Sequence, residues 1–330
     1  MRKRLAIFIF SILLMLLTVS FFGINKVLQV LLTSDISYVF LAVLCQIIII
    51  CLYGLRLKAV SSKYKSISYK DALYTSIVGN FVSQITPVAK IGGQPLMIYL
   101  LKKDIGSEKA SAAVIVDTVI DFIVSTLLII GILIVFYGSI PYIIFLPLLV
   151  FAIITLVLIL GFIKMFLSKN ALARLIDWSI EKLKRFKRID KIFHTQIFQS
   201  SFKTFLHDRK ILSLSAALTL LVKAFELARI WLVFAAISIF LPLTVLIIVW
   251  AIIVVLLTIP WLPGSLGLYE FGAASAFVVL GLMPSQAAGG ILLERFISFW
   301  FVIVFSAIVA TISKNKLSSL FAMSEKKELQ

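Results

Sequence analysis

Ionisable side chains stand inside long apolar stretches of this chain. Asp117 and Asp121 are four residues apart in one such stretch, which places them on one face of a helix. Glu294 and Arg295 stand together in another stretch. An ionisable group in hydrocarbon costs about 2.5–3.5 kcal/mol, so it usually faces a cavity or an opposite charge. The two aspartates have no cation near them in the sequence, and we expect Arg295 or Lys90 to neutralise them from another segment.

A third stretch carries charged residues at every third position, namely Lys223, Glu226 and Arg229. Residues three apart on a helix are neighbours and can form ion pairs. Two interpretations stay open: a structural ion-pair network within the helix, and a contribution to a polar cavity. Glu294 could in the same way pair with Arg295 or with a neighbouring helix.

Two turns rich in proline and glycine add backbone groups to these side chains. They read ITPVAKIGG at residues 85–93 and PWLPGSLG at residues 260–267. Helix N-termini at such turns would present amide groups to an anion such as phosphate. A polar face precedes the first turn. Together these patterns give the candidate binding residues Asn80, Gln84, Pro87, Lys90, Gly92, Gly93, Asp117, Asp121, Pro263, Gly264, Gly267, Glu270, Glu294 and Arg295.

No catalytic motif accompanies these residues. The sequence contains no histidine–aspartate pair at acyltransferase spacing, no aspartate-rich metal motif and no nucleophile beside a base. His194 and His207 fall in a basic segment, and Cys45 and Cys51 share one apolar stretch. Neither pair belongs to a cluster of metal-binding residues. We therefore expect no enzyme activity, no cofactor and no metal site.

The composition indicates a membrane protein. Of 330 residues, 62% are apolar and 14% are charged, and the mean hydropathy is +1.12. A soluble domain is nearer half apolar with about a quarter of its residues charged. The net charge is +17, but the lysines and arginines occupy short segments between apolar stretches. That distribution marks topology and contacts with anionic lipid rather than a nucleic-acid partner.

Apolar stretches of roughly 20 residues, enough to cross a bilayer, recur along the whole chain. They predict an all-α polytopic membrane protein with about six spanning helices and two re-entrant helical hairpins. The first stretch follows the basic start MRKR and has no clear cleavage site, so we expect a retained span rather than a signal peptide. We place the spanning helices at residues 5–24, 36–56, 107–136, 141–163, 211–238 and 284–312.

The basic residues predict the orientation. They precede the first span, follow the second span from Arg56 onward, and cluster at 102–109, in the loop 164–210 and after 312. The opposite set of connections contains only Lys26. By the positive-inside rule, both termini and the long loop face the cytoplasm of a multi-pass cell-membrane protein.

Two broken segments, 71–101 and 242–281, contain the two turns. The predicted orientation puts both ends of the first segment at the cytoplasmic face and both ends of the second at the outer face. We therefore predict that each segment enters the membrane, turns at its proline and glycine residues, and returns to the same side. The alternative is one ordinary kinked span in each place.

An internal repeat relates the two halves of the chain. Residues 104–122 align without a gap on residues 281–299, which places Asp117 on Glu294. We divide the single transmembrane domain into repeats at about 1–140 and 141–330, and three crossings per half would make them inverted. Inverted repeats with interrupted helices are typical of alternating-access carriers, whose site lies near the midplane at the repeat interface.

The basic loop 164–210 contains an apolar stripe at helical spacing between residues 172 and 193. With its many lysines and arginines, this pattern is typical of an interfacial helix lying on anionic lipid headgroups at the cytoplasmic face. The alternative is a plain connecting helix.

Three segments carry a family resemblance. They are ITPVAKIGGQP at residues 85–95, TIPWLPGSLGLYE at 258–270 and LLERFISFW at 292–300. They resemble the flippase-like transmembrane region of lysylphosphatidylglycerol synthase, a family that includes uncharacterised membrane proteins of archaea and bacteria. The resemblance covers essentially the whole chain. Members often carry an arginine after the acidic position of the third span, where this chain has Thr118.

The resemblance implies a translocation function. In bifunctional relatives the membrane region moves aminoacylated lipid between leaflets, while a separate soluble domain makes that lipid. We expect only the translocation half here, with Asp117, Asp121, Glu270 and Arg295 contacting the headgroup. The alternative is an integral-membrane transferase, or an accessory scaffold for a separately encoded lipid synthase. The expected partners are membrane lipids, with a homo-oligomer or such a synthase as further possibilities.

Overall fold

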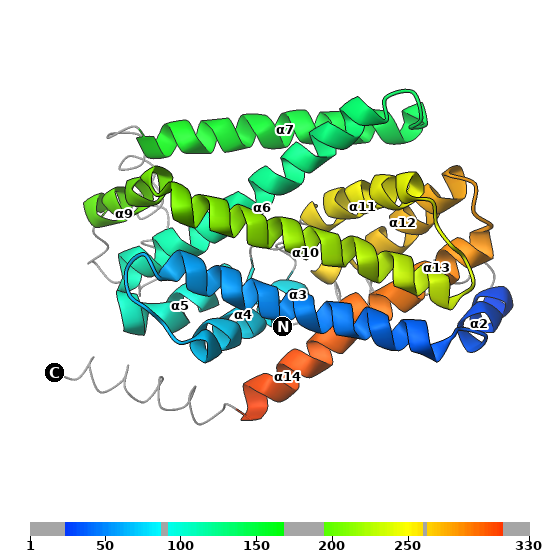
Figure 1. The fold of residues 1–330 in the computed structure, drawn as a ribbon, viewed down its shortest axis with the longest axis horizontal. Coiled ribbons are helices and arrows are strands. Elements are labelled where there is room, and N and C mark those ends of the chain that lie inside the picture. The colour runs from blue at the N-terminus through cyan, green and yellow to red at the C-terminus, as the bar shows by residue number, and fades with distance from the viewer. Residues whose placement is uncertain (1–23, 87–91, 168–194, 260–262, 313–330) are drawn as a thin grey trace, which may run out of the picture.

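The chain is an all-α polytopic membrane protein in the computed structural model (Figure 1). The structure describes residues 24–86, 92–167, 195–259 and 263–312. Within these residues, five helices are long and apolar enough to cross a membrane. The predicted first span, 5–24, and the predicted interfacial helix, 172–193, lie outside the described residues.

The five long helices confirm the corresponding predicted spans. They are α3 (Ile36–Ser61), α6 (Ser107–Val135), α7 (Tyr142–Leu167), α10 (Arg209–Ala236) and a composite of three helical segments. The composite runs through α13 (Pro284–Arg295), the π-helical η3 (Phe296–Phe301) and α14 (Val302–Ile312) without leaving the helical conformation. The second span was predicted to end at 56, but α3 continues to Ser61, which proves important for Arg56 below.

Both predicted broken segments consist of two helices separated by a turn. The first contains α4 (Tyr69–Ile85) and α5 (Gln94–Ile105), and the second contains α11 (Leu243–Thr258) and α12 (Leu268–Val279). In each segment the two helices contact each other. We name the intervening residues 86–93 the first turn and residues 259–267 the second turn. Neither segment is a single kinked helix, although entry into the membrane from one side stays a prediction.

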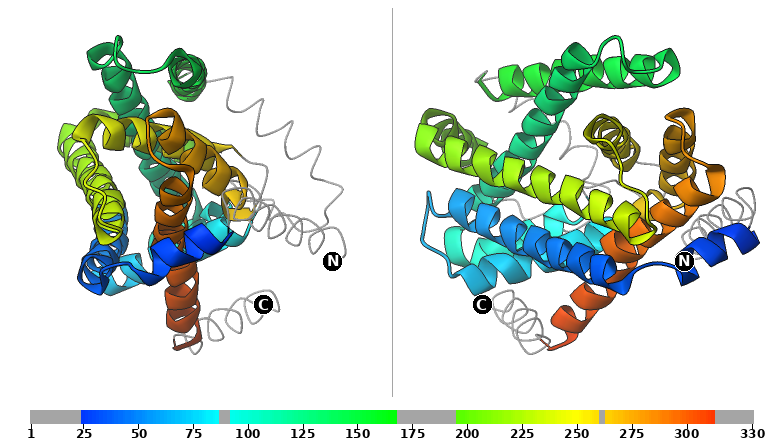
Figure 2. Two further views of the ribbon diagram at one scale, coloured as in Figure 1. Left: turned by 90° about the vertical axis from the view of Figure 1, so that its right-hand side faces the viewer. Right: turned by 45° about the vertical axis from the view of Figure 1, so that its right-hand side comes forward.

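Helices α3 and α10 lie side by side and antiparallel along one side of the molecule (Figures 1 and 2). At one end, the Asp35 N–H donates to the Ala236 carbonyl at 2.8 Å. At the other end, Lys63 forms an ion pair with Asp208. Since α3 belongs to the predicted first repeat and α10 to the second, this pair joins the two halves. The inverted repeat itself stays a prediction.

Two shorter helices flank the long ones. Helix α2 (Ile24–Leu32) occupies most of the connection predicted at 25–35. Helix α9 (Thr195–His207) lies in the predicted basic loop. Its Phe202 and Phe205 are 1% and 0% exposed, which shows that this part of the loop packs firmly onto the membrane helices.

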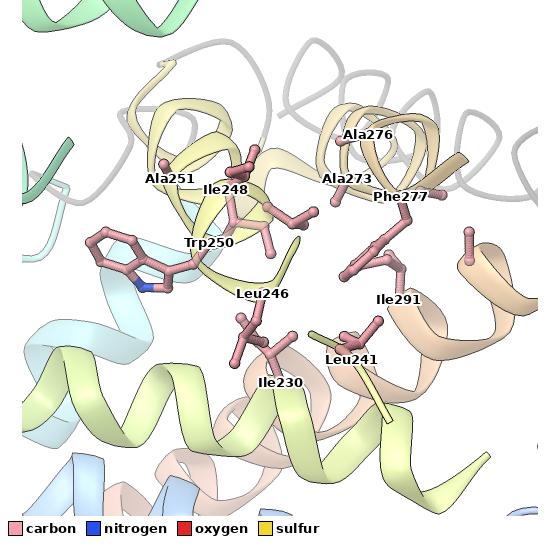
Figure 3. Close-up of a cluster of buried hydrophobic side chains, with 14 of the residues drawn as sticks. Ile230, Leu241, Leu246, Ile248, Trp250, Ala251, Ala273, Ala276, Phe277 and Ile291 are labelled. Atoms are coloured by element: carbon pink, nitrogen blue, oxygen red, sulfur yellow. The ribbon is translucent and has the colours of Figure 1, made fainter. Parts of the chain in front are cut away.

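The apolar core lies between α10, α11, α12 and α13 (Figure 3). Phe277 of α12 packs on Phe234 of α10 with ring centroids 4.3 Å apart. Helix α7 lies at the edge of the molecule and exposes large apolar side chains such as Val157 and Leu158, as a lipid-facing helix would. In Figure 3 the Trp250 indole points away from Phe277, and its nitrogen reaches the polar region described next.

Candidate functional site

A cavity of about 220 Å³ lies between α3, α4, α6, α10, α11 and the composite helix. We name it the central cavity. Half of the predicted binding residues line it, although they come from both interrupted segments and from two long helices, α6 and the composite helix. These residues are Asn80, Gln84, Asp117, Asp121, Gly264, Glu294 and Arg295.

The other predicted residues do not line the cavity. Gly92 and Gly93 belong to the first turn and Gly267 to the second turn. Glu270 lies near the start of α12, and its side chain is buried, with 1% exposure. Pro87 and Lys90 lie outside the described residues. So does the side chain of Pro263, the residue that begins the short helix η2 (Pro263–Ser265) in the second turn.

Asp117 and Asp121 are paired by a residue that sequence analysis had assigned to a cytoplasmic connection. Arg56 donates from Nε to Asp117 at 2.7 Å and from Nη2 at 3.0 Å. Its Nη1 donates to Asp121 at 3.2 Å and to Thr219 at 3.0 Å. Because α3 extends to Ser61, Arg56 belongs to this helix rather than to the connection after it. The residue is buried in the molecule, with 4% exposure.

This arrangement corrects the predicted neutralisation of the aspartates. Arg295 does not reach them but forms an ion pair with Glu270. Among the described residues, Arg56 and Lys223 from other helices pair with the aspartates, and the other predicted cation, Lys90, lies outside those residues. Arg56 and Lys223 both lie far from the aspartates along the chain, so a search for cations close in sequence could not have found them.

The Lys223–Glu226 ion pair was predicted and is confirmed at 3.5 Å. It is not a closed local network, however, because Lys223 also lies 3.2 Å from Asp121 on α6. Glu226 accepts hydrogen bonds from the Tyr53 hydroxyl at 3.3 Å and the Trp250 indole N–H at 3.0 Å. The charged residues of α10 therefore connect α3, α6 and α11 around the cavity.

Arg229 forms the corresponding pair in the second half. Its Nη2 donates to Glu294 at 2.7 Å, and its Nη1 donates to Gln46 of α3. Glu294 also accepts hydrogen bonds from the hydroxyls of Tyr269 and Ser298. Glu294 therefore pairs with a neighbouring helix, the second of its two predicted alternatives. Asp117 and Glu294, which the sequence alignment superposes, each pair with an arginine of the antiparallel α3–α10 pair.

The second turn is fixed by buried charges. Glu270 accepts from the Gly267 N–H and from Arg295 Nε at 2.8 Å, and Arg295 Nη2 donates to the Gly264 carbonyl. The guanidinium lies between the rings of Tyr269 and Phe299, 4.3 and 4.5 Å from their centroids. Glu270 and Arg295 thus hold the turn in place, and Glu270 already occupies the helix N-terminus that we had expected to receive an anion.

The first turn is fixed by uncharged groups. The Gly93 N–H donates to Ser83 Oγ at 2.9 Å. A Cβ at Gly93 would lie 1.7 Å from the Gly79 carbonyl oxygen, so α4 and the start of α5 approach each other closely only because this residue is glycine. Gln94 donates to Thr118 of α6 at 2.6 Å. Thr118, which departs from the family pattern, therefore connects α5 to α6.

Asn80 and Gln84 differ from the charged residues of the cavity. Both are partly exposed, and neither side chain forms a hydrogen bond to any part of the chain that the structure describes. Asn80 and Gln84 lie four residues apart on α4 and hence on one helix face. The cavity thus has one wall of mutually paired charges and one wall of uncharged amides.

The lining residues that the sequence analysis missed include four with polar or aromatic side chains: Gln46, Tyr53, Arg56 and Trp250. A signal existed for three of them. Gln46, Tyr53 and Arg56 are seven and three residues apart in one apolar stretch, which is the spacing of a polar face on a helix. Trp250 gives no such signal, because an aromatic residue in an apolar helix is ordinary. No group of metal-binding side chains occurs among the residues described.

Known proteins similar to this chain are membrane proteins. Residues 4–306 match the family described as "Lysylphosphatidylglycerol synthase TM region". A UPF0104 membrane protein of Methanothermobacter thermautotrophicus is 29% identical over 288 residues, covering 82% of this chain and 83% of the relative. A UPF0104 membrane protein of Methanocaldococcus jannaschii is 23% identical and covers 96% of each chain.

A third relative, a UPF0104 membrane protein of Pyrococcus horikoshii, is 20% identical over 96% of this chain and 99% of its own length. These matches extend over nearly the whole sequence, so they include the two interrupted segments and the helices around the cavity. The chain belongs to the lysylphosphatidylglycerol synthase transmembrane-region family.

Proposed function

We propose that this protein is a membrane lipid translocase. The observation that carries the proposal is a polar cavity of about 220 Å³ inside a bundle whose helices are apolar enough to span a bilayer. A polar headgroup would occupy the central cavity while its hydrocarbon chains stay in the surrounding lipid. The headgroup could then cross the membrane without passing through hydrocarbon.

The energetic cost of the cavity supports a functional role. Several kcal/mol of desolvation accompany the burial of each charge, even when the charges pair well. Apolar residues would pack the same space at lower cost, as buried ion pairs are often replaced without loss of stability. Buried charges that line a cavity inside a membrane protein, here Arg56, Arg229 and Arg295 with their carboxylate partners, therefore support a role of that cavity in the passage of a polar molecule.

The interrupted segments support the same proposal. Backbone that leaves the helical conformation at membrane depth is tolerated where it is buried in protein or lines a wet cavity. Gly264 of the second turn lines the cavity, and α4 presents its polar face to it. We propose that both segments are re-entrant, and that both chain termini face the cytoplasm of the cell membrane.

Cysteine labelling tests the re-entrant topology. In a background without Cys45 and Cys51, single cysteines at the exposed positions Ser66 and Asp104 flank the first interrupted segment. Re-entrance predicts that an impermeant thiol reagent labels both positions from the same side of the membrane. Labelling from opposite sides would show that the segment crosses once and would remove this part of the proposal.

Leaflet exchange in reconstituted vesicles tests translocation. Wild-type protein should accelerate the exchange of tail-labelled lipids above the rate of protein-free vesicles. Asn80→Trp should abolish the acceleration by filling the cavity, because this side chain lines it and has no partner to lose. Gln29→Trp, at an exposed amide of α2 outside the cavity, is the matched control and should keep the wild-type rate. Wild-type exchange at the protein-free rate for every lipid would exclude the proposal, and product formation from an added donor would indicate a transferase.

A further inference from the structure

The charged side chains of the central cavity are occupied by one another. All three nitrogens of Arg56 donate to side chains of α6 and α10. Arg295 is engaged by Glu270 and by the Gly264 carbonyl. Both terminal nitrogens of Arg229 are engaged as well, and its Nε is buried without an acceptor among the described residues. A ligand would have to break an ion pair to reach these charges.

Two amides on α4 are not engaged in this way. Asn80 and Gln84 line the cavity from one face of α4, and both amides lack a partner in the described chain while remaining accessible. An amide without a partner at membrane depth is costly. These two side chains are therefore free to bind a polar molecule in the cavity, whereas the charged residues are already paired.

The chemistry of an amide decides what that molecule is. Each amide offers both a donor and an acceptor, and among the common groups of lipid headgroups an uncharged hydroxyl can satisfy both. An ammonium group could only donate and a bare phosphate could only accept, so each would leave half of the amide capacity unused. Both would also prefer a charged partner.

We propose that Asn80 and Gln84 select a lipid headgroup with several hydroxyl groups, such as a sugar or a glycerol. This inference rests on the proposed translocation function and deepens it. The amides lie about one helical turn apart, roughly 6 Å, a separation that neighbouring hydroxyls of one headgroup can span. The charged wall then supplies the shape of the cavity rather than the recognition of the headgroup.

Equilibrium binding tests the inference separately from transport. Purified full-length protein in a polyoxyethylene detergent would be titrated calorimetrically with four short-chain lipids that share their acyl chains. Their headgroups are glucosyl, phosphoglycerol, phosphoethanolamine and bare phosphate. A maltoside detergent is unsuitable, because its own hydroxyl groups would compete for the amides. Tighter binding of the glucosyl lipid would identify a sugar as the ligand, and tighter binding of the phosphoglycerol lipid would identify glycerol.

The wild-type protein should bind the better hydroxylated lipid at least tenfold more tightly than either lipid without extra hydroxyls. Asn80→Leu and Gln84→Leu should each weaken that binding roughly tenfold, the usual effect of one lost hydrogen bond. Neither should lower the melting temperature, since no internal hydrogen bond is lost. Gln29→Leu is the control and should bind like the wild type.

Two outcomes would overturn the inference: equal or absent binding of all four lipids to the wild type, or an unchanged preference in both leucine variants. The vesicle assay separates this from the proposed function. A binding preference without leaflet exchange would support the selection of hydroxyl groups and contradict translocation. Exchange that is independent of the headgroup and of both amides would do the reverse.

Discussion

The two turns that interrupt the helices are built in different ways. The second turn is fixed by a buried ion pair between Glu270 and Arg295, and two glycines in it have positive φ, +57° at Gly264 and +82° at Gly267. The first turn has no such pair among its described residues. It is fixed by the Ser83–Gly93 hydrogen bond and by the close approach of two helices at glycine.

This difference indicates a division of labour between the halves of the molecule. Charges that hold a turn are satisfied within the protein and are unavailable to a ligand. In the described part of the chain, the wall beside the first turn uses no charge for its own structure, and it is also where Asn80 and Gln84 line the cavity without a protein partner. The second segment therefore supports the cavity, and under our proposal the first provides the groups that contact a bound headgroup.

Removal of one partner from the second turn should have the largest effect. Glu270→Gln would leave Arg295 buried, 3% exposed, without its anion. The expected loss of stability is about 3–5 kcal/mol, typical of breaking a buried ion pair. The free energy of unfolding in a detergent titration measures it.

The double variant Glu270→Gln/Arg295→Gln should lose less than the sum of the two single variants, because neither charge is then left unpaired. Lys102→Gln, at an exposed lysine of α5, is the control and should be nearly neutral. A loss below about 1 kcal/mol for Glu270→Gln would mean that the second turn does not depend on its ion pair.

Stability at the first turn should depend on the size of the side chain at residue 93 rather than on charge. Gly93→Ala would place a Cβ 1.7 Å from the Gly79 carbonyl oxygen and 2.6 Å from its carbon, both backbone atoms. Helices α4 and α5 must then move apart, at an expected cost of about 1–3 kcal/mol. Gly131→Ala on α6 is the matched control, since no atom lies within 4 Å of its added Cβ. Equal stability of the two alanine variants would contradict the close approach.

Much of the fold could be predicted from sequence. Apolar length placed the five described spanning helices, and proline with glycine placed both turns. The error at Arg56 has a physical cause: a window of about 20 residues ended the span there, whereas α3 has 26 residues and buries the arginine. The positive-inside count therefore included one cation that serves the cavity.

The site was harder to predict than the fold. Residue types marked Asp117, Glu294 and Arg295 correctly as buried and polar, but pairing depends on how helices far apart in the sequence pack. Arg56 lies 61 residues from Asp117, and Arg229 lies 65 residues from Glu294. The sequence also does not show which charged side chains face the cavity. For this reason Glu270 was expected to contact a headgroup, although both of its carboxylate oxygens accept hydrogen bonds within the protein.

The smallest effect on stability is expected at the Lys63–Asp208 ion pair. Comparison of this pair with the buried Glu270–Arg295 pair tests whether burial makes the ion pair of the second turn strong. Lys63 donates to Asp208, and this hydrogen bond, together with that from the Ile211 N–H, lowers the pKa of the Asp208 carboxyl. A lowered folded-state pKa stabilises the protein fully above the ordinary aspartate value of about 3.9 and loses that contribution as the pH falls through the lowered pKa.

Asp208→Asn keeps the cap on α10, because asparagine caps a helix as well as aspartate does, but removes the titration. The difference in melting temperature between wild type and Asp208→Asn should therefore be small near neutral pH, and it should disappear in acid. It should also shrink at high salt, which screens exposed charges and leaves buried pairs nearly unaffected. A salt effect of equal size on Glu270→Gln would show that the second turn is open to solvent, and the contrast between the two turns would then fail.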